Sequence, residues 1–388
     1  EKKVFVKKDG RGRYLDAFEY KTCDFAGRNL VLTMDKTIQF ITERALKEAV
    51  DKYHAKSGMA IVANPKTGAV LAIANYPFFN PNSYKEYNRK FWRNRVITDS
   101  YEPGSIIKMF LAAAAIEFGI CTPASIFFCE NGEYRIGKNI IHDSHAYEWL
   151  TLTQIVKFSS NIGIVKVSET LGKETIYNTL LNFGFGKKTG IDFPGETSGI
   201  LSHYIRWTDV DAATIGFGQG ISVSAIQLIA AASTIANGGI LMKPYIVHTI
   251  IDKDNRIIKS NTPKQLRRVI SQETATNIRD ILIEVTTENG TGKRAALELY
   301  TICGKTGTAQ KAESGYGYLK GKYIASFLGF APAKAPEIVI LVTVDEPEKH
   351  SYGGIVAGPV FKQIAHETLN YLGVPHKKSM NDIIAKAG

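Results

Sequence analysis

The sequence lacks an apolar run long enough to cross a membrane. Its longest apolar stretch spans residues 109–116, far fewer than the ~20 residues that a bilayer-spanning helix needs. The chain begins at Glu1 rather than at a methionine, so we expect a processed or truncated fragment. The missing hydrophobic run therefore says little about an anchor in the native protein.

Cysteine is also scarce. The chain has four cysteines and no C-x-x-C pair, which is typical neither of a disulfide-rich scaffold nor of a zinc site. Cys121 and Cys129 are close enough in sequence to pair in an oxidising compartment. Their spacing does not fix the Cα geometry that a disulfide needs, so the oxidised and reduced states both stay open.

Internal repeats and low-complexity segments are absent as well. Hydrophobic residues make up 44% of the 388 residues and charged residues 22%, which predicts a folded protein with a sizeable core rather than a disordered chain. Lysine and arginine number 48 against 37 acidic residues, giving a net charge of +11. Because the basic residues are scattered and no nucleic-acid-binding motif accompanies them, we expect a generally basic surface and no nucleic-acid partner.

The order of hydrophobic patterns predicts an α+β fold. A helix capped by Asp35 should run to the Ser57-Gly58 break, and a closing helix should span residues 357–372. We expect an antiparallel five-stranded sheet packed by these N- and C-terminal helices, with an all-helical subdomain inserted between its second and third strands. The predicted sheet strands are residues 59–63, 70–74, 301–312, 323–331 and 337–345, and the predicted buried helices are residues 105–118 and 224–236.

Ser105 and Lys108 form an S-x-x-K pattern at the start of the first buried helix. Residues i and i+3 share a helix face, so the lysine can reach the serine from one turn away. Burial would lower the lysine pKa, as a base for serine near neutral pH requires. The N–H groups at the helix start would favour a developing oxyanion. Alone, the pattern is better explained by a capping serine and an ordinary lysine.

A second pattern, Ser159-Ser160-Asn161, interrupts a helical stretch that begins at Thr151 or Thr153. A hydroxyl and an amide at such a break could project into one cleft. The hydroxyl could relay a proton, and the amide could hold a peptide carbonyl. An ordinary polar turn explains the pattern better when it is considered alone.

A third pattern, Lys305-Thr306-Gly307-Thr308, lies inside a predicted strand. Gly307 leaves room for another backbone to come close. The lysine charge and the threonine hydroxyls suit a substrate carboxylate. The alternative for this pattern is an exposed edge strand protected by its lysine.

The three patterns together are far more specific than any one of them. In chain order they read S-x-x-K, S-x-N and K-T-G, which is the signature of the penicillin-recognising serine enzymes. Longer segments resemble class B penicillin-binding proteins, most of all the cell-division, or septal, branch, with elongation-type and sporulation-type relatives as the alternatives. The resemblance runs from about Asn29 to Leu372 and is carried by residues 101–105, 216–220, 304–310, 329–332, 345–347 and 352–361.

The resemblance implies a peptidoglycan D,D-transpeptidase that cross-links stem peptides ending in D-Ala-D-Ala and is acylated by β-lactam antibiotics. Neither a metal nor a cofactor is implied. The residues carried over are Ser105 as nucleophile, Lys108 as general base, Ser159 as proton relay, Asn161 as a contact to the substrate backbone, Lys305, Thr306, Gly307 and Thr308 around the terminal carboxylate, and the backbone N–H groups of Ser105 and Thr308 as oxyanion hole.

The resemblance also implies a cellular setting. We expect an extracytoplasmic domain of a protein anchored in the bacterial membrane by an N-terminal helix, working with a polytopic membrane glycosyltransferase of the division machinery. Residues 1–28 would be a linker or the remnant of a non-catalytic pedestal domain. Residues 29–375 would form the transpeptidase domain, and residues 376–388 a C-terminal tail.

Other interpretations are weaker. His142-Asp143-Ser144-His145 has no distant third-ligand motif, so we expect a loop rather than a metal site. Gly304-Lys305-Thr306 lacks the phosphate-loop glycine at position 299, which is Leu299. A serine β-lactamase would need a deacylating glutamate, and Glu196 is the nearest candidate by position. A D,D-carboxypeptidase or a β-lactam sensor of the same superfamily stays open, although sensors usually have valine where Asn161 stands.

Overall fold

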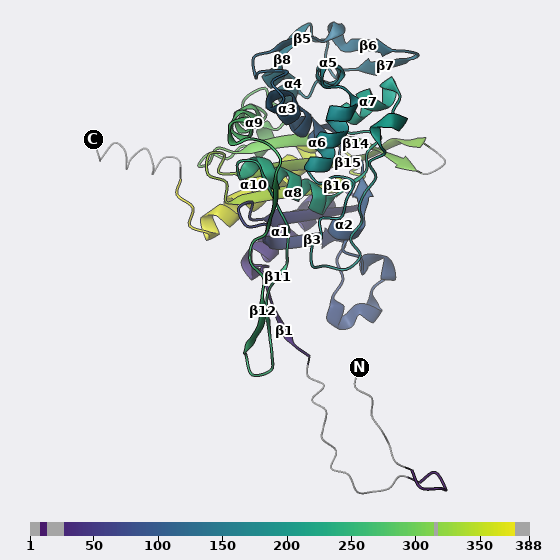
Figure 1. Cartoon of the computed structure of the whole chain (residues 1–388), viewed down its shortest axis with the longest axis vertical. Helices are drawn as coiled ribbons and strands as arrows, with labels where there is room; N and C mark the ends of the chain where they lie inside the picture. The colour runs from purple at the N-terminus through teal and green to yellow at the C-terminus, as the bar shows by residue number, and fades with distance from the viewer. Residues whose placement is uncertain (1–7, 14–26, 314–316, 377–388) are drawn as a thin grey trace, which may run out of the picture.

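The computed structural model describes residues 8–13, 27–313 and 317–376, and its centre is a five-stranded sheet (Figure 1). The strand order is β14-β15-β16-β2-β3, and every neighbouring pair is antiparallel. This arrangement confirms the predicted α+β class. The strands are β2 (Ser57–Ala63), β3 (Val70–Tyr76), β14 (Cys303–Glu313), β15 (Gly317–Ala331) and β16 (Ile338–Asp345).

Both faces of the sheet are buried. Helices α1 (Lys36–Lys52) and α10 (Gly353–Tyr371) pack on one face, as the sequence predicts, and the helical half packs on the other. Alternate residues of β16 belong to two hydrophobic cores, one on each face of the sheet. Ile340 and Val342 pack with α1 and α10, whereas Val339 and Leu341 pack in the core of the helical half. Because both faces of the sheet are covered, all eight residues of β16 are buried, and buried apolar residues do not alternate with exposed polar ones along this strand.

The helical half lies above the sheet in Figure 1. Its central helix, α3, is buried almost all round, and Phe110 on α3 contacts the rings of Phe183 and Phe185. The α-helices outside α1 and α10 are α2 (Arg95–Thr98), α3 (Lys108–Glu117), α4 (Leu152–Phe158), α5 (Asn161–Leu171), α6 (Lys173–Asn182), α7 (Asp209–Gly216), α8 (Ala225–Ala236) and α9 (Gln272–Glu284).

The prediction that the inserted half is all helical is wrong in detail. It also contains antiparallel strand pairs of two to four residues, too short to leave a periodic signal in the sequence. The pairs are β4 (Ser100–Tyr101) with β9 (Val223–Ser224), β5 (Ile126–Phe128) with β8 (Trp149–Thr151), β6 (Glu133–Ile136) with β7 (Asn139–His142), and β10 (Ile240–Met242) with β13 (Gln265–Arg268).

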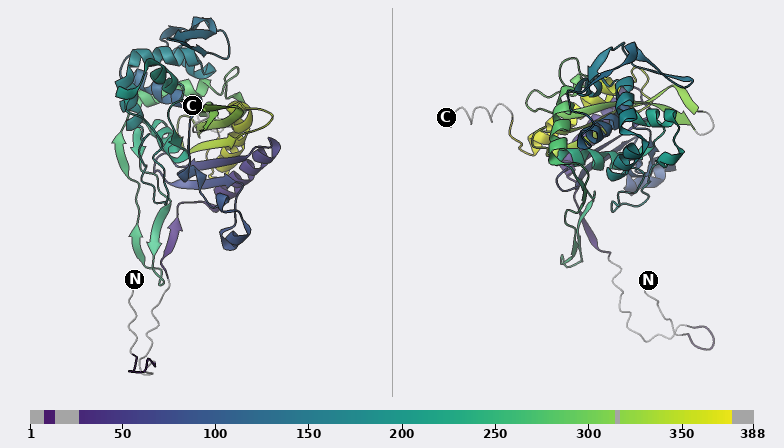
Figure 2. Two further views of the ribbon diagram at one scale, coloured as in Figure 1. Left: turned by 90° about the vertical axis from the view of Figure 1, so that its right-hand side faces the viewer. Right: turned by 45° about the horizontal axis from the view of Figure 1, so that its top comes forward.

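A three-stranded arm extends from the body, as Figure 2 shows in its left-hand view. It consists of β1 (Asn29–Leu32), β11 (Val247–Ile251) and β12 (Ile257–Ser260). All four residues of β1 are exposed. The arm therefore adds little to the core that positions the candidate residues.

Three element boundaries differ from the prediction by more than three residues. Helix α1 ends at Lys52, and the predicted break at Ser57-Gly58 is the start of β2. Strand β15 starts at Gly317 rather than 323, because its outer residues pair with β14 in a hairpin that extends beyond the core. Helix α10 begins at Gly353 rather than 357, although glycine is a poor helix former.

The cysteines in the described residues are unpaired with one another. Cys121, Cys129 and Cys303 are all free and buried, so the structure holds no Cys121–Cys129 disulfide. Within the same residues, no helix is long and apolar enough to span a bilayer.

Candidate active site

A pocket of about 450 Å³ opens between β14, an edge strand of the sheet, and the helical half. Residues from all three sequence patterns line it, although more than 200 positions separate the first from the last. The residues that contribute to its wall from these patterns are Ser105, Ser159, Asn161, Thr306 and Thr308. The fold thus assembles the candidate residues in one place.

Ser105 lies in η3 (Gly104–Ile107), a turn of 3₁₀ helix that runs directly into α3. Gly104 has a φ of +54°, and a Cβ on it would lie 2.9 Å from the carbonyl oxygen of Thr308. On its other side, the N–H of Gly104 donates to the carbonyl of Gly218 at 3.2 Å. Glycine therefore lets the segment that carries Ser105 fit closely between β14 and the loop that follows α7.

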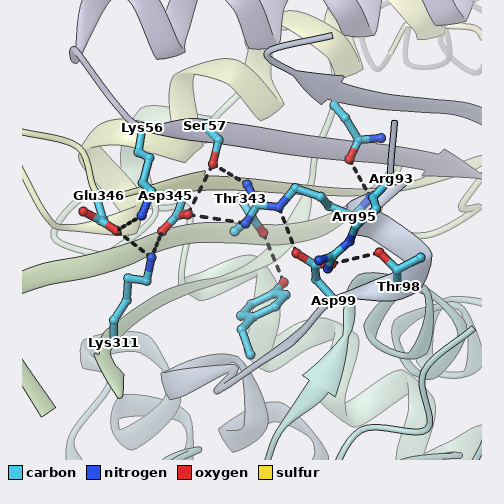
Figure 3. A network of polar contacts seen from close by, with 12 residues as sticks. Lys56, Ser57, Arg93, Arg95, Thr98, Asp99, Lys311, Thr343, Asp345 and Glu346 are labelled. Atoms are coloured by element: carbon cyan, nitrogen blue, oxygen red, sulfur yellow. Dashed lines mark hydrogen bonds and ion pairs between the residues drawn. The ribbon is translucent and has the colours of Figure 1, made fainter. Parts of the chain in front are cut away.

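The residues before Ser105 are fixed to the end of the sheet by the polar network in Figure 3. Arg95 pairs with Asp99 at 3.0 Å and with Asp345 at 3.3 Å, and it also donates to Ser57. On the far side of this network, Lys311 contacts Asp345 at 2.9 Å. Charged side chains of α2, β14 and β16, together with the Ser57 hydroxyl on β2, thus fix the segment before Ser105 to the sheet.

The side chain of Lys108 is completely buried, with an exposed fraction of 0%. Its Nζ donates to the backbone oxygen of Ser159 at 2.5 Å and to Asn161 Oδ1 at 2.8 Å, and Ser159 Oγ lies 3.2 Å from it. Burial lowers the pKa of Lys108 to about 7, against a smaller opposing effect of the Asp143 charge. A lysine with this pKa is available as a base near neutral pH.

The second pattern forms the sharp turn between α4 and α5. Thr151 caps α4 in a capping box with Gln154, so it is Thr151 rather than Thr153 that starts this helix. Ser159 ends α4 in the left-handed conformation, with a φ of +61°, and Ser160 then caps α5 by accepting from the N–H of Gly163. This turn presents both the carbonyl and the hydroxyl of Ser159 to Lys108.

Lys305 is also completely buried, which rules out the exposed edge-strand interpretation of its motif. Its Nζ lies 3.0 Å from Ser159 Oγ and 3.1 Å from the carbonyl of Thr306. Burial, and then the nearby charge of Lys108, hold the pKa of Lys305 well below its usual value. The Ser159 hydroxyl therefore lies between two buried amino groups.

The remaining residues of the third pattern shape the wall of the pocket. A Cβ on Gly307 would lie 3.0 Å from the carbonyl oxygen of Pro103, so the expected close approach of a second backbone occurs here. Thr306 Oγ1 contacts Thr291 Oγ1 at 3.1 Å, and Thr308 Oγ1 accepts from the N–H of Gly353 at 3.1 Å.

One expected contact is not formed. Among the described residues, no hydrogen bond joins Lys108 to Ser105, and the lysine donates to the second pattern instead. Catalytic hydrogen bonds are often long in unliganded enzymes and tighten when substrate binds. The two residues nevertheless follow each other within one helical turn beside the pocket.

Sequence reasoning missed two residues that hold the site. Asp143 accepts hydrogen bonds from Ser160 Oγ and from the N–H groups of Asn161 and Ile162. Thr291 lines the pocket next to Thr306. Asp143 belongs to the run rejected as a metal site, and no local signal indicates which helix its carboxylate caps. In the described residues, no three or more His, Cys, Asp or Glu side chains are arranged to hold a metal.

The fold and the pocket together define a class of protein. Its half-buried serine at a helix start, two buried lysines and shared serine hydroxyl are groups that can serve acyl transfer as nucleophile, base and proton path. The sequence matches the penicillin binding protein transpeptidase domain over residues 58–366. The chain belongs to this family.

Curated relatives agree with this assignment. The chain is 34% identical to the probable peptidoglycan D,D-transpeptidase PenA of Neisseria meningitidis, covering 98% of this chain and 64% of the relative. It is 39% identical to stage V sporulation protein D of Bacillus subtilis, covering 91% and 55%. It is 34% identical to the peptidoglycan D,D-transpeptidase FtsI of Escherichia coli, covering 95% and 60%. The chain thus spans less than two thirds of the length of these relatives.

Solved structures share the fold. The transpeptidase domain of penicillin-binding protein 3 from Burkholderia pseudomallei has a TM-score of 0.79 and 38% identity, covering 89% of this chain and 97% of that one. Penicillin-binding protein 3 from Mycobacterium tuberculosis, complexed with aztreonam, has a TM-score of 0.85 and 32% identity, covering 90% and 80%.

Proposed function

We propose that this chain is a serine-type peptidoglycan D,D-transpeptidase domain that cross-links stem peptides ending in D-Ala-D-Ala. The observation that carries the proposal is the line of contacts from Lys108 through Ser159 to Lys305, beside Ser105 in one pocket. It combines a candidate base of lowered pKa with a hydroxyl that can pass on a proton.

In the first step, Ser105 Oγ attacks the carbonyl carbon between the two D-Ala residues, and its proton passes to the neutral amine of Lys108. The backbone N–H groups of Ser105 and Thr308 stabilise the oxyanion. The tetrahedral intermediate then breaks the C–N bond, and Ser159 relays a proton from Lys108 to the leaving D-Ala amine. An ester on Ser105 remains, and an amine from a second stem peptide resolves it with return of the proton to Ser105.

The third pattern positions the substrate in this proposal. The terminal carboxylate of the stem peptide lies against Thr306 and Thr308, with the charge of Lys305 behind them. Gly307 keeps β14 close to the nucleophile. Asn161 is already engaged by Lys108 and His142, so its second amide hydrogen is the group that remains for a substrate carbonyl.

We place this activity in septal wall synthesis, because the resemblance to the division branch agrees with the identity to FtsI. The identity to a sporulation protein favours a spore-wall role as the second candidate. We further propose an extracytoplasmic, membrane-anchored protein that works with a polytopic glycosyltransferase. In this arrangement residues 1–28 connect to a pedestal domain, residues 29–375 form the catalytic domain and residues 376–388 a tail.

The decisive test is intact mass after incubation with benzylpenicillin. We expect the mass to rise by one penicillin, and peptide mapping to place the adduct on the segment from Tyr101 to Lys108. Ser105→Ala should remain unmodified. An unchanged wild-type mass, or a label that survives Ser105→Ala, would overturn the proposal.

A second assay separates transpeptidation from carboxypeptidation. The enzyme is given a stem peptide ending in D-Ala-D-Ala, with or without an amine acceptor. We expect most of the released D-Ala to be matched by the cross-linked product when the amine is present. Release of D-Ala with hydrolysed donor only would instead identify a D,D-carboxypeptidase.

A further inference from the structure

The loop that follows β7 holds the second motif from outside it. Its carboxylate, Asp143, accepts from Ser160 Oγ at 2.5 Å and from the N–H of Ile162 at 3.2 Å, and it also accepts from the N–H of Asn161. The neighbouring carbonyl of His142 accepts from Asn161 Nδ2 at 3.0 Å. One short loop thus binds the backbone and the side chain of Asn161 at once.

These contacts act on a turn that does not form easily on its own. Ser159 adopts the left-handed conformation, which is unfavourable for a residue other than glycine and is common at functional sites. The first N–H groups of α5 lack partners inside the helix, and Asp143 supplies one. The Asp143 carboxylate is therefore part of what keeps the Ser159 turn in place.

The loop itself is anchored. The N–H of Asp143 donates to the carbonyl of Gly132 at 3.1 Å, next to the β6–β7 hairpin. The orientation of the Asn161 amide also follows from the loop, because the His142 carbonyl can only accept and so must face Nδ2. Asn161 Oδ1 is then left facing Lys108.

We propose that Asp143 is a positioning residue for acylation, because its carboxylate fixes the turn that presents Ser159 and Asn161 to Lys108. The proposal rests on the proposed transpeptidase function and adds a residue that lies outside its three motifs. Asp143 acts through Asn161 and Ser160, without itself contacting the reacting atoms.

The charge of Asp143 gives this role a distinct signature. It favours the protonated form of Lys108 and so opposes the effect of burial on that pKa. Lys305 on β14 interacts electrostatically with Lys108, and like charges disfavour the protonated forms of both amines. Asp143 also interacts electrostatically with the buried thiol of Cys129 and the hydroxyl of Tyr147. Both groups are neutral near pH 7, because burial raises their pKa.

The test is the rate constant for acylation by benzylpenicillin, measured from well below to well above pH 7. In Asp143→Asn the plateau rate should fall roughly 10–100-fold, since small displacements in an active site can cost about 10²-fold. The acidic limb should also move to lower pH, because protonated Lys108 loses a stabilising negative charge. Glu133→Gln is the matched control. Glu133 is an exposed acid on the same hairpin, with its carboxylate 3.7 Å from the His142 ring, and its replacement should change neither the plateau rate nor the position of the acidic limb.

Asp143→Glu separates position from charge and also serves if Asp143→Asn fails to fold. It keeps the negative charge but displaces the carboxylate oxygens by one methylene. The acidic limb of the pH profile should therefore stay at the wild-type pH, and the plateau rate should fall. A plateau rate equal to that of the wild-type protein in either variant overturns the proposal. A lower plateau rate in Asp143→Asn with no shift of the acidic limb also overturns it, because that result would indicate a purely structural role. Failure of the wild-type protein to react at Ser105 would instead overturn the proposed function.

Discussion

At the scale of single residues, the contacts of Lys108 can be made by a neutral amine. Ser159 O and Asn161 Oδ1 can only accept hydrogen bonds, and they lie 2.5 and 2.8 Å from Nζ. A neutral amine has two N–H groups and one lone pair, so these two acceptors leave the lone pair directed elsewhere. The lone pair can then accept a proton from a hydroxyl. This geometry agrees with the pKa of about 7 that burial gives the side chain.

Acylation should therefore depend on pH through Lys108. The neutral amine is the active form, so the rate should rise as pH increases through about 7 and level off above it. Lys108→Ala should lower the plateau ~10²–10⁴-fold, the usual contribution of a general base. Stopped-flow acylation with benzylpenicillin measures both effects. A flat profile across pH 7 in the wild-type protein, or a variant with the wild-type rate, would contradict this assignment.

Lys305 should have a different effect, on ligand selectivity. Its amine lies 3.0 Å from Ser159 Oγ and 3.1 Å from the carbonyl of Thr306, and in the proposed function its positive charge attracts the substrate carboxylate. Lys305→Ala should lower reactivity more toward benzylpenicillin than toward its carboxyl ester. The ratio of the two acylation rate constants is the measurement. Equal losses toward both ligands would remove the distinction between the two lysines.

At the scale of elements, glycine allows the backbones around Ser105 to touch. Gly218 has a φ of +85°, and a Cβ on it would lie 2.0 Å from the carbonyl oxygen of Gly104. Gly119, at the end of α3, has a similar φ of +68°, but a Cβ there would meet nothing within 4 Å. Both glycines therefore have a positive φ, but only at Gly218 would an added Cβ clash with neighbouring atoms.

This difference predicts the outcome of two alanine variants. Gly119→Ala should cost only the conformational strain, about 1–2 kcal/mol of stability, and should leave acylation unchanged. Gly218→Ala adds a clash with the segment that carries Ser105, so acylation should fall along with the melting temperature. Thermal unfolding and the acylation rate of both variants test this. Equal behaviour of the two would show that the close approach does not matter.

The sequence predicts the elements with a strong periodic or capping signal. Asp35 does cap α1, and the sheet strands lie where apolar runs predict them. The short strand pairs of the helical half escape prediction because two to four residues carry no measurable period. The outer part of β15 escapes it because exposed residues need only backbone pairing to form a strand.

The motifs are predictable for a similar reason, and their supporting residues are not. The spacing of Ser105 and Lys108 is a local property of one helix, so the sequence can show it. The contact of Lys305 with Ser159 joins positions 146 residues apart, and the family resemblance implied only that both belong to one active site. Asp143 is an ordinary loop residue in sequence, and its role depends on tertiary contacts alone.

At the scale of the whole molecule, the site exists only where the two halves meet. The helical half supplies Ser105, Lys108 and Ser159, and the edge of the sheet supplies Lys305 and its neighbours. Both lysines are buried because each half covers the other. The packing that stabilises the molecule therefore also lowers the Lys108 pKa on which the proposed chemistry depends.

The same architecture bears on the fate of the acyl-enzyme. A β-lactamase needs a base that activates water against its own acyl-enzyme, and Glu196 is the nearest candidate by position. In the structure its Oε1 accepts from the N–H of Thr189 at 2.6 Å and from Thr189 Oγ1 at 2.5 Å, and its Oε2 accepts from the N–H of Gly190 at 3.0 Å. Glu196 does not line the active-site pocket. Its carboxylate holds a loop together and is not placed to activate water.

We therefore expect the penicilloyl adduct on Ser105 to persist for many minutes or longer. Without a positioned base, water attacks the ester slowly, and an enzyme that transfers its acyl group to an amine gains from excluding water. A mass-spectrometric time course after removal of free penicillin measures the lifetime. Glu196→Gln should leave this lifetime unchanged even if it lowers the melting temperature, because its contacts are structural. Recovery of free enzyme within seconds, with steady turnover of penicillin, would identify a β-lactamase instead.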